Sequence, residues 1–419
     1  MSTAAERADT SYREVLRNRD FRLLFAGQAV STVGDEIFPI AATISVINAS
    51  GGGNAKGAVI AVGLVQGARF LAIVSFALIG GVWADRLPRR LVMISSDIVA
   101  ALAILTLALI PGTPHVWVIA VCVFVVGAAE AFFRPAETAI LPSLIPDRQL
   151  TVANGLISVS YRTAAVVGPG LGGLFIVGVG VRSAYVLDVI ALTVSALTLL
   201  RLREPIREPA SRTASVRHEI AEGWRELRTQ RWAVTTIFAG AAFLMLVVSP
   251  ENVLLPIIGR REFGGDAVYA WSLALFSLGG VVGAVLAIRI RTTHPGRVGW
   301  LLGLLFAPVL VALAFPRSAA LILALYFVAG AGWEPFNIYW QSAIQREFPA
   351  DKLARISSLD WMLSFGLMPL GLALTGPLAA LVGTQAVMLG AAVVCVVICL
   401  GVQLVPGVAE FRNPTPKRP

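Results

Sequence analysis

Residues 57–90 read GAVIAVGLVQGARFLAIVSFALIGGVWADRLPRR, an apolar block that ends in two glycines, an acid and three arginines. The apolar part has the length of about 20 residues that a helix needs to cross a hydrocarbon layer ~30 Å thick. Similar blocks recur along all 419 residues, which are 57% hydrophobic and 14% charged, with a mean hydropathy of +0.77. Average soluble domains carry roughly 25% charged residues. The sequence therefore predicts an all-α membrane protein with many spans and excludes an ordinary soluble domain.

Twelve membrane-spanning helices are predicted from these blocks. We place them at residues 21–48, 57–83, 91–110, 115–139, 150–178, 183–202, 232–258, 267–290, 297–315, 319–341, 354–378 and 384–405. An even number puts both termini on one side. The loops and arms on that side hold 26 of the 34 Lys and Arg residues, and the opposite loops hold five. Because cytoplasmic loops are enriched in Lys and Arg, we expect both termini in the cytoplasm and the spans in the cytoplasmic (inner) membrane.

A long polar segment, residues 203–231, divides the spans into two groups of six, and its second part predicts an amphipathic surface helix. The predicted organisation is a cytoplasmic arm (1–20), a six-helix bundle (21–202), this linker (203–231), a second six-helix bundle (232–405) and a cytoplasmic tail (406–419). An offset of 203 residues aligns Gly127 with Gly330 and Gly168 with Gly371. This shared register indicates a duplicated, pseudo-symmetric bundle. Parallel six-helix repeats place a substrate site at their interface near the membrane midplane.

Several classes of chemistry are disfavoured by what the sequence lacks. It contains no GxxxxGK[ST] phosphate-binding loop, so a gradient or a partner has to supply any energy for transport. Cys122, Cys395 and Cys399 all lie in apolar blocks, so we expect neither a disulfide framework nor a metal site. The Arg-rich residues 1–20 lack the apolar core of a cleaved signal, so we expect this arm to be retained. We expect no cofactor and no nucleic-acid partner.

A motif of glycines and charges follows the second predicted span. It consists of Gly80, Gly81, Asp85, Arg86, Arg89 and Arg90. The glycines allow helices to approach closely, and the charges can form a cytoplasmic latch in which Glu137 is a further partner for Arg86 or Arg89. An ordinary basic loop explains the arginines but not the acid and the paired glycines. In a chain of twelve spans the motif resembles the loop 2–3 signature of the major facilitator superfamily, which implies two six-helix bundles and secondary transport.

A second motif, VVGPGLGG, lies at residues 166–173 in the fifth predicted span. Its residues Gly168, Pro169, Gly172 and Gly173 resemble the GPxxGG motif of proton-driven exporters in that superfamily. Gly168 and Gly172 form a face of small residues, and the eighth span offers a matching face at Gly279 and Gly283. Generic packing of membrane helices is the alternative explanation.

The resemblance extends over LRNRDFRLLFAGQAVSTVGDEIF (16–38) and FFRPAETAILPSLIPDRQLTVANGL (132–156). Both stretches resemble a subgroup of the superfamily that includes macrolide efflux pumps and the enterobactin exporter. The chain departs from the drug exporters at Val123, where those proteins carry an arginine four residues before the glycine of the fourth span. A proton relay centred on that arginine is therefore not transferred to this chain.

Six charged residues lie deep within the spans of the first bundle. On insertion scales they would together cost about 15 to 20 kcal/mol if they faced lipid, so we expect them to face the bundle interior. They are Asp35, Glu36, Arg69, Glu130, Arg134 and Arg162. Glu130 and Arg134 are spaced i, i+4, so a purely structural ion pair is an equally good explanation for these two.

The candidates for proton coupling are acids at depth. We select Asp35, Glu36, Glu130 and Glu334, with Asp35 first. One span 1 acid is expected to face the cavity while its neighbour packs against Arg69 or Arg162. Glu251 and Asp360 are further acids at depth that could take up a proton, but they lie closer to span ends, where hydration is the alternative explanation. Asp97 and Asp188 lie closer still, and we interpret them as structural.

Aromatic residues gather in the tenth and eleventh spans near Glu334. Trp333, Phe336, Trp361 and Phe365 are the candidates for a substrate cavity that takes a bulky, apolar and cationic solute. Core packing and interfacial belts are the alternative, which fits Tyr339 and Trp340 at least as well.

Together with the resemblance, these features lead us to expect a proton-coupled exporter of amphipathic small molecules such as drugs, antibiotics or siderophores, working by alternating access. The expected partners are the small-molecule substrate, protons and membrane lipid, and we expect a monomer. An uptake permease would carry more Asn, Gln and His at mid-span. A receptor or scaffold would need a folded soluble domain or a long tail. An enzyme is the weakest alternative, because no His/Cys/Asp cluster or Ser/His arrangement recurs at one depth.

Overall fold

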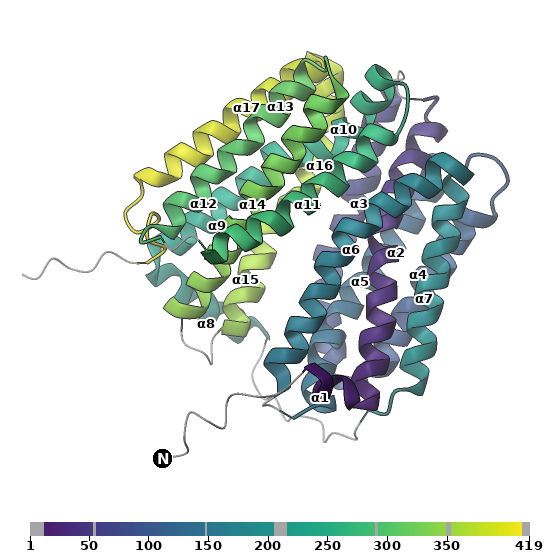
Figure 1. Ribbon diagram of the computed structural model, residues 1–419, viewed down its shortest axis with the longest axis vertical. Coiled ribbons are helices and arrows are strands. Elements are labelled where there is room, and N and C mark those ends of the chain that lie inside the picture. Colours follow the sequence, from purple (N-terminus) through teal and green to yellow (C-terminus); the bar gives the residue numbers. More distant parts are fainter. Residues whose placement is uncertain are drawn as a thin grey trace, which may run out of the picture. The chain divides into compact units, whose positions relative to one another are not determined.

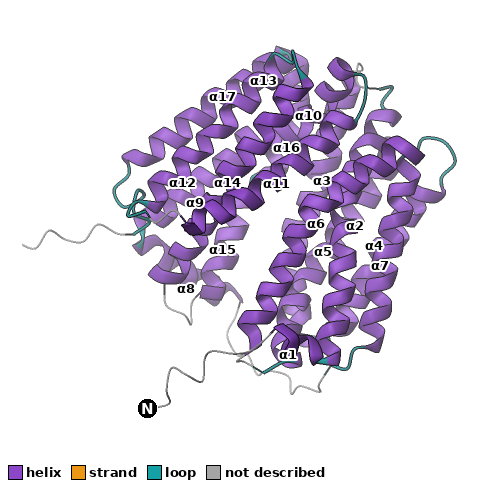
Figure 2. Ribbon diagram, viewed as in Figure 1, coloured by secondary structure: helices purple, strands orange, loops and turns teal. Residues whose placement is uncertain are grey.

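The computed structural model describes residues 12–52, 56–146, 149–204, 216–289, 292–348 and 353–412. Within these ranges all regular structure is helical, and there are no strands (Figure 2). Eleven helical segments in this part of the chain are long and apolar enough to cross a membrane. The 30-residue helix α6 (Leu150–Val179) occupies the position predicted for the fifth span. Several of its side chains are not among those described. The twelve predicted spans therefore all correspond to helices.

The chain forms two compact units. Unit 1 comprises residues 1–49 and 68–211, and unit 2 comprises residues 50–67 and 212–419. Helix α3 (Lys56–Arg86) contributes its first part to unit 2 and its second part to unit 1. Figure 1 shows the helices of unit 1 in purple to teal and those of unit 2 mostly in green to yellow.

Unit 1 is built around α2 (Arg19–Ala49), the most enclosed of the candidate spans, with 72% of its apolar window buried. It packs against α5, α6 and α7, and α4 packs against α5 and α7. The other helices of the unit are α1 (Tyr12–Arg17), α4 (Arg89–Leu109), α5 (Val116–Leu144) and α7 (Val181–Arg201). A charge placed at the middle of α2 is therefore surrounded by other helices of the same bundle.

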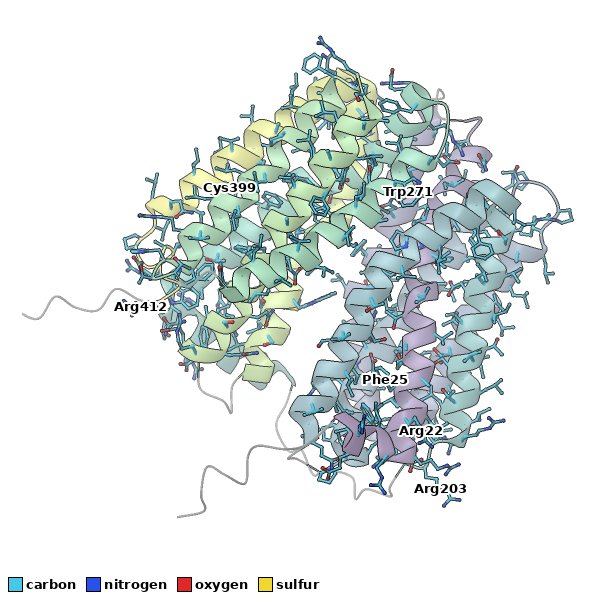
Figure 3. The ribbon with its side chains drawn as sticks, viewed as in Figure 1. Arg22, Phe25, Arg203, Trp271, Cys399 and Arg412 are labelled. Atoms are coloured by element: carbon cyan, nitrogen blue, oxygen red, sulfur yellow. The ribbon has the colours of Figure 1, made fainter. Side chains whose placement is uncertain are left out.

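One end of unit 1 gathers basic and capping residues. The side chain of Asn18 accepts hydrogen bonds from the backbone N–H groups of Asp20 and Phe21 at 3.0 and 3.1 Å, which starts α2. The backbone N–H of Arg203, which follows α7, donates to Asp20 at 3.0 Å. Arg22 and Arg203 thus lie at the same end of the unit (Figure 3). The residues predicted to precede span 1 and to follow span 6 meet here, as an even number of spans between them requires.

Unit 2 contains shorter helices because prolines interrupt three of its spans. Span 7 is broken by a π-helical turn at Leu244–Val248, just before Pro250, and span 9 by a 3-10 turn at Leu304–Phe306, just before Pro308. Span 11 is broken at Leu367, before Pro369. The helices are α8 (Val216–Thr229), α9 (Arg231–Phe243), α10 (Ser249–Phe263), α11 (Ala267–Arg289), α12 (Pro295–Gly303), α13 (Ala307–Ala314), α14 (Ala319–Glu347), α15 (Leu353–Gly366), α16 (Met368–Val382) and α17 (Thr384–Gly401).

The glycines paired by the 203-residue offset occupy equivalent helix contacts in the two units. A Cβ on Gly127 of span 4 would lie 2.6 Å from a span 2 carbonyl oxygen, and one on Gly330 of span 10 would lie 1.9 Å from a span 8 carbonyl oxygen. Likewise, Gly168 of span 5 packs on span 1, and Gly371 of span 11 packs on span 7. Close backbone approach at small residues is how membrane helices associate. The duplicated bundle predicted from the sequence is therefore present in the structure.

Candidate functional site

Charged side chains from five helices of unit 1 line one internal cavity. Asp35 comes from α2, Arg69 from α3, Asp97 from α4, Glu130 and Arg134 from α5, and Asp188 from α7. The cavity has about 40 Å³ of space for the centres of water-sized molecules. That volume admits a few waters or a small ion, whereas sites for drug-sized molecules measure ~300 to 1,000 Å³. We call this set of six residues the charged cluster.

Glu130 is the bridging acid of the charged cluster. Its carboxylate accepts a hydrogen bond from Nη2 of Arg69 at 2.9 Å and lies 3.8 Å from Arg134 on its own helix. The intrahelical pair expected from the i, i+4 spacing is thus present, but it is the longer of the two contacts. Glu130 therefore joins α3 to α5, and its role is not limited to an ion pair within its own helix.

Arg134 is held from a second side by Glu137 and Tyr161. Its guanidinium lies 3.8 Å from Glu137 and 4.7 Å from the centre of the Tyr161 ring on α6, a cation–π distance. The Tyr161 hydroxyl is within 2.7 and 2.8 Å of the two Glu137 carboxylate oxygens, to which it can donate its proton. Glu137 is thus held by Arg134 and Tyr161 within the membrane-embedded part of unit 1, and its pairing with Arg86 or Arg89 stays a prediction.

The two acids of span 1 have no arginine at ion-pair distance within the described residues. Arg69, one of the two partners proposed for them from the sequence, is paired with Glu130 instead. The side chain of Arg162, the other proposed partner, lies outside the described residues. Asp35 lines the cavity, while the Cβ of Glu36 lies against Gly168 of α6. The structure thus separates the two neighbours as their 100° angular spacing predicts.

Asp97 and Asp188 were interpreted as structural residues near span ends, and the structure brings both into the same cavity as Asp35. They are 3% and 1% exposed. Asp97 accepts a hydrogen bond from the hydroxyl of Ser195 at 2.7 Å, and Gln28 donates to that hydroxyl at 3.4 Å. The spacing of Asp188 and Ser195, two helical turns apart on span 6, is the sequence signal that marks a polar face directed into the bundle.

The motif after span 2 is described only in part. The surroundings of Gly80 and Gly81 and the side chains of Asp85 and Arg86 are not described, so the latch predicted from the sequence stays a prediction for these four residues. The backbone N–H groups of Arg89 and Arg90 donate to the carboxylate of Glu204 at 3.1 and 3.0 Å. The Arg90 guanidinium donates to the carbonyls of Leu199 and Leu200, at the end of α7. These arginines therefore join α4 to the end of α7.

The GPGLGG segment packs inside its own bundle. A Cβ on Gly168 would lie 2.5 Å from the Cβ of Glu36, and one on Gly172 would lie 3.3 Å from Ile37 of α2. Pro169 is buried beside them, and Gly173 follows on the same helix.

Gly279 and Gly283 of span 8 pack against α14 within unit 2, and their pairing with span 5 stays a prediction. Cβ atoms on Gly279 and Gly283 would lie 1.9 and 2.3 Å from carbonyl oxygens of α14.

The acids of unit 2 are separate from one another. Glu251 is 5% exposed and accepts a short hydrogen bond from the Tyr326 hydroxyl. Asp360 is 9% exposed and accepts from Nε1 of Trp340 at 3.0 Å and from Ser364 at 3.3 Å. The burial of both acids argues against hydration, the alternative left open for them by the sequence. Glu334 is half-buried beside α11, with its Cβ 3.9 Å from a Cβ built on Gly280.

The predicted aromatic cavity residues fall into two groups. Trp333 stacks on Phe243 at 5.2 Å between ring centres, and Phe336 contacts Trp300 at 4.8 Å, so both are packed within unit 2. Trp361 and Phe365 stack on each other at 4.4 Å, and Trp361 is 54% exposed.

The aromatic cluster of unit 2 also contains a residue that sequence reasoning did not select. Phe411, which follows the last span, is 0% exposed and has its ring centre 5.8 Å from Trp232, 5.7 Å from Trp340 and 6.2 Å from Phe336. The backbone N–H of Arg297 in α12 donates to the carbonyl of Ala409 at 3.0 Å, which holds the chain in this folded-back path. Arg412, labelled in Figure 3, marks the end of the described chain beside this cluster.

A family profile described as Major Facilitator Superfamily matches residues 24–368 of the chain. The chain belongs to the major facilitator superfamily. It is accordingly a multi-pass membrane transporter and not an enzyme. The match covers all of the charged cluster and the spans from 1 to the first part of 11.

Relatives of this superfamily transporter include efflux proteins. It is 26% identical to macrolide efflux protein A of Streptococcus pyogenes over 94% of this chain and 96% of that protein. It is 28% identical to the multidrug efflux pump Tap of Mycolicibacterium fortuitum over 80% of this chain and 84% of that protein.

Solved structures of the same fold include a single-residue mutant of the nucleoside transporter NupG, with a TM-score of 0.71, 14% identity and coverage of 91% of this chain and 99% of that one. A bacterial homologue of the lysosomal transporter Spinster has a TM-score of 0.70, 17% identity and coverage of 98% and 100%. At these identities the likeness establishes the fold alone.

Proposed function

We propose that this superfamily member is a proton-coupled exporter of amphipathic small molecules, such as antibiotics, other drugs or siderophores, and that it works by alternating access. We place it in the cytoplasmic membrane with both termini in the cytoplasm, as the distribution of Lys and Arg favours. The observation that carries the proposal is the charged cluster of unit 1. Ionisable groups are costly at membrane depth, so a cavity lined by four acids and two arginines is a functional site by default.

The outward direction and the class of substrate rest on the relatives. Two proteins that align with most of this chain are named for macrolide efflux and multidrug efflux. The small cavity in unit 1 holds no drug-sized molecule, so we assign it to coupling and not to the substrate. Trp361, which is exposed and stacks on the half-buried Phe365, is available to a bulky apolar solute, and cations bind favourably to such rings.

Asp35 is the proposed coupling residue. It lines the cavity without an arginine at ion-pair distance in the described part of unit 1, whereas Glu130 is paired with both arginines. A carboxylate without a paired cation is the group whose charge a proton can change at least cost to the surrounding ion pairs. Protonation of Asp35 from outside would favour one conformation, and release of that proton inside would restore the other.

Transport by everted membrane vesicles tests this proposal. Vesicles from a host without its own efflux pumps would be energised so that their lumen is acidic, which gives an outward-directed proton gradient, and uptake of a labelled macrolide, a cationic dye and a ferric siderophore would be followed. We expect uptake of at least one probe that nigericin abolishes. Asp35→Asn should remove gradient-driven uptake, and Asp266→Asn, which changes an acid paired with Arg260 at 2.6 Å outside unit 1, should leave it intact.

Two results would contradict the proposal. Uptake of no probe at normal expression would argue against an exporter of this substrate class. Full gradient-driven uptake by Asp35→Asn would place the coupling site elsewhere, with Glu36, Glu130 and Glu334 as the next residues to change.

A further inference from the structure

Three acids of unit 1 remain after the arginines of the cavity have been assigned to partners. Arg69 pairs with Glu130 at 2.9 Å, and Arg134 lies 3.8 Å from both Glu130 and Glu137. Two arginines are thus balanced by two glutamates. Asp35, Asp97 and Asp188 line the same cavity with no described basic group within ion-pair distance.

Asp188 is the most enclosed of these three acids. It is 1% exposed and lines the cavity from α7. A Cβ built on Gly34 would lie only 2.3 Å from its Oδ1 atom, so the carboxyl group packs directly on the backbone of α2, one residue before Asp35. That same Oδ1 atom accepts no hydrogen bond within the described residues. An ionised carboxylate with an unpaired oxygen at this depth is unfavourable, so the geometry calls for a proton or another cation on it.

Asp97 faces the same space from α4 with one hydrogen bond. Its partner is the hydroxyl of Ser195 at 2.7 Å, two helical turns after Asp188 on α7. The cavity between Asp35, Asp97 and Asp188 has room for water, which can carry a proton between carboxyl groups that do not touch. No three His, Cys, Asp or Glu side chains in the described ranges are arranged to hold a metal ion. A proton therefore suits the site better than a metal cation.

We propose that Asp188, together with Asp97, forms a second proton-binding site in unit 1, behind Asp35. A hydronium in the cavity gives its proton to the Asp188 carboxylate, which becomes a neutral carboxylic acid and leaves one water. The role of this site in transport rests on the proposed function. The binding of the proton does not, because it is a property of the bundle alone. The charged and titratable groups that face it are Asp35 and Glu36 from α2, Arg69 from α3, Asp97 from α4, Glu130, Arg134 and Glu137 from α5, and Tyr161 from α6, whose neighbour Arg162 has no described side chain.

Infrared spectroscopy of the purified full-length protein tests the site without a substrate and without transport. Protonated carboxyl groups give a C=O stretching band that shifts in D2O, and ionised carboxylates do not contribute to it. We expect Asp188→Asn to remove one carboxyl group's share of this band at neutral pH. The control Asp266→Asn should leave the band unchanged, because Asp266 is ion-paired with Arg260.

Asn has the shape of a protonated Asp, so we expect Asp188→Asn to fold and to be purified in normal yield. Ser195→Ala supplies a second readout that does not depend on that variant. Because Asp97 belongs to the same site, loss of its hydroxyl donor should change the frequency of the protonated-carboxyl band without removing the band.

A full band in Asp188→Asn would overturn the proposal. Loss of the wild-type band on addition of NaCl at constant pH would also overturn it, since the site would then bind an alkali cation in place of the proton. Failure of the vesicle experiment with the infrared result intact would argue against the exporter but not against the site. Gradient-driven uptake in the vesicles together with a full infrared band in Asp188→Asn would rule out the second site and leave Asp35 as the only proposed coupling residue.

Discussion

Substitution of Glu130 tests whether one acid holds both arginines of the charged cluster. Its carboxylate receives a hydrogen bond from Arg69 at 2.9 Å and lies 3.8 Å from Arg134. Glu130→Gln keeps the size of the side chain and removes its charge, so both arginines lose this partner. Arg69→Gln removes only the closer contact and leaves Glu130 beside Arg134. The structure therefore predicts that Glu130→Gln lowers the free energy of unfolding more than Arg69→Gln does.

The expected magnitudes follow from the burial of the pair. A hydrogen bond between charged groups contributes ~1.5 to 3 kcal/mol, and removal of one partner of a fully buried pair costs ~3 to 5 kcal/mol. The Arg69 and Glu130 side chains are 20% and 28% exposed, which places the loss near the lower values. We expect the free energy of unfolding to fall by about 2 to 3 kcal/mol for Glu130→Gln and by about 1 to 2 kcal/mol for Arg69→Gln. The double variant should lose less than the sum by about 1 to 2 kcal/mol, because its second change removes an already unpaired charge.

Reversible unfolding in mixed detergent micelles measures these free energies. Glu262→Gln is the matched control, because Glu262 pairs with Arg261 at an exposed site and should change stability by less than ~0.5 kcal/mol. The reasoning is refuted if Glu130→Gln is no more destabilising than Arg69→Gln, or if the double variant loses the full sum.

Three further substitutions probe other contacts. Phe411→Ala should lower the free energy of unfolding by about 3 to 5 kcal/mol because the ring is fully buried, whereas Arg412→Ala, at an exposed position, should have little effect in the same unfolding assay. Glu204→Ala removes the acceptor for two N–H groups at the start of α4 and should lower the free energy of unfolding by about 0.5 to 2 kcal/mol. Amide exchange at Arg89 and Arg90 should become faster, and unchanged exchange would contradict a capping role. Gly168→Ala should reduce both stability and transport, because the new Cβ would lie 2.5 Å from the Cβ of Glu36 on α2. The control Gly155→Ala, on the same helix and facing open space, should reduce neither. Equal behaviour of the two variants would show that the α2–α6 contact tolerates a larger residue.

The helices and the duplication could be predicted because their signals are local. Each span is a block of apolar residues, and the pairing of Gly127 with Gly330 requires only a constant offset between two segments. The Glu130–Arg134 face follows from helical spacing alone. These properties do not depend on which helix lies next to which.

The membership of the charged cluster could not be predicted in the same way. Asp188 enters the cavity because Gly34 leaves room for its carboxyl group, a contact between helices that are far apart in the chain. Glu251 lies near a predicted span end, where water would be expected, yet Tyr326 covers it. Each of these outcomes depends on helix neighbours, which hydropathy does not encode.

The folded-back path of Phe411 has a consequence for the order in which unit 2 is completed during synthesis. The residue follows the last span, but it fills the centre of an aromatic cluster whose other members, including Trp232 and Trp340, are translated much earlier. The pocket for the Phe411 ring therefore stays open after the twelfth span has entered the bilayer, until the next residues leave the ribosome and fold back. In that interval the open rings are an apolar surface that chaperones and proteases can recognise. Unit 2 thus becomes a finished fold only after its membrane insertion has ended.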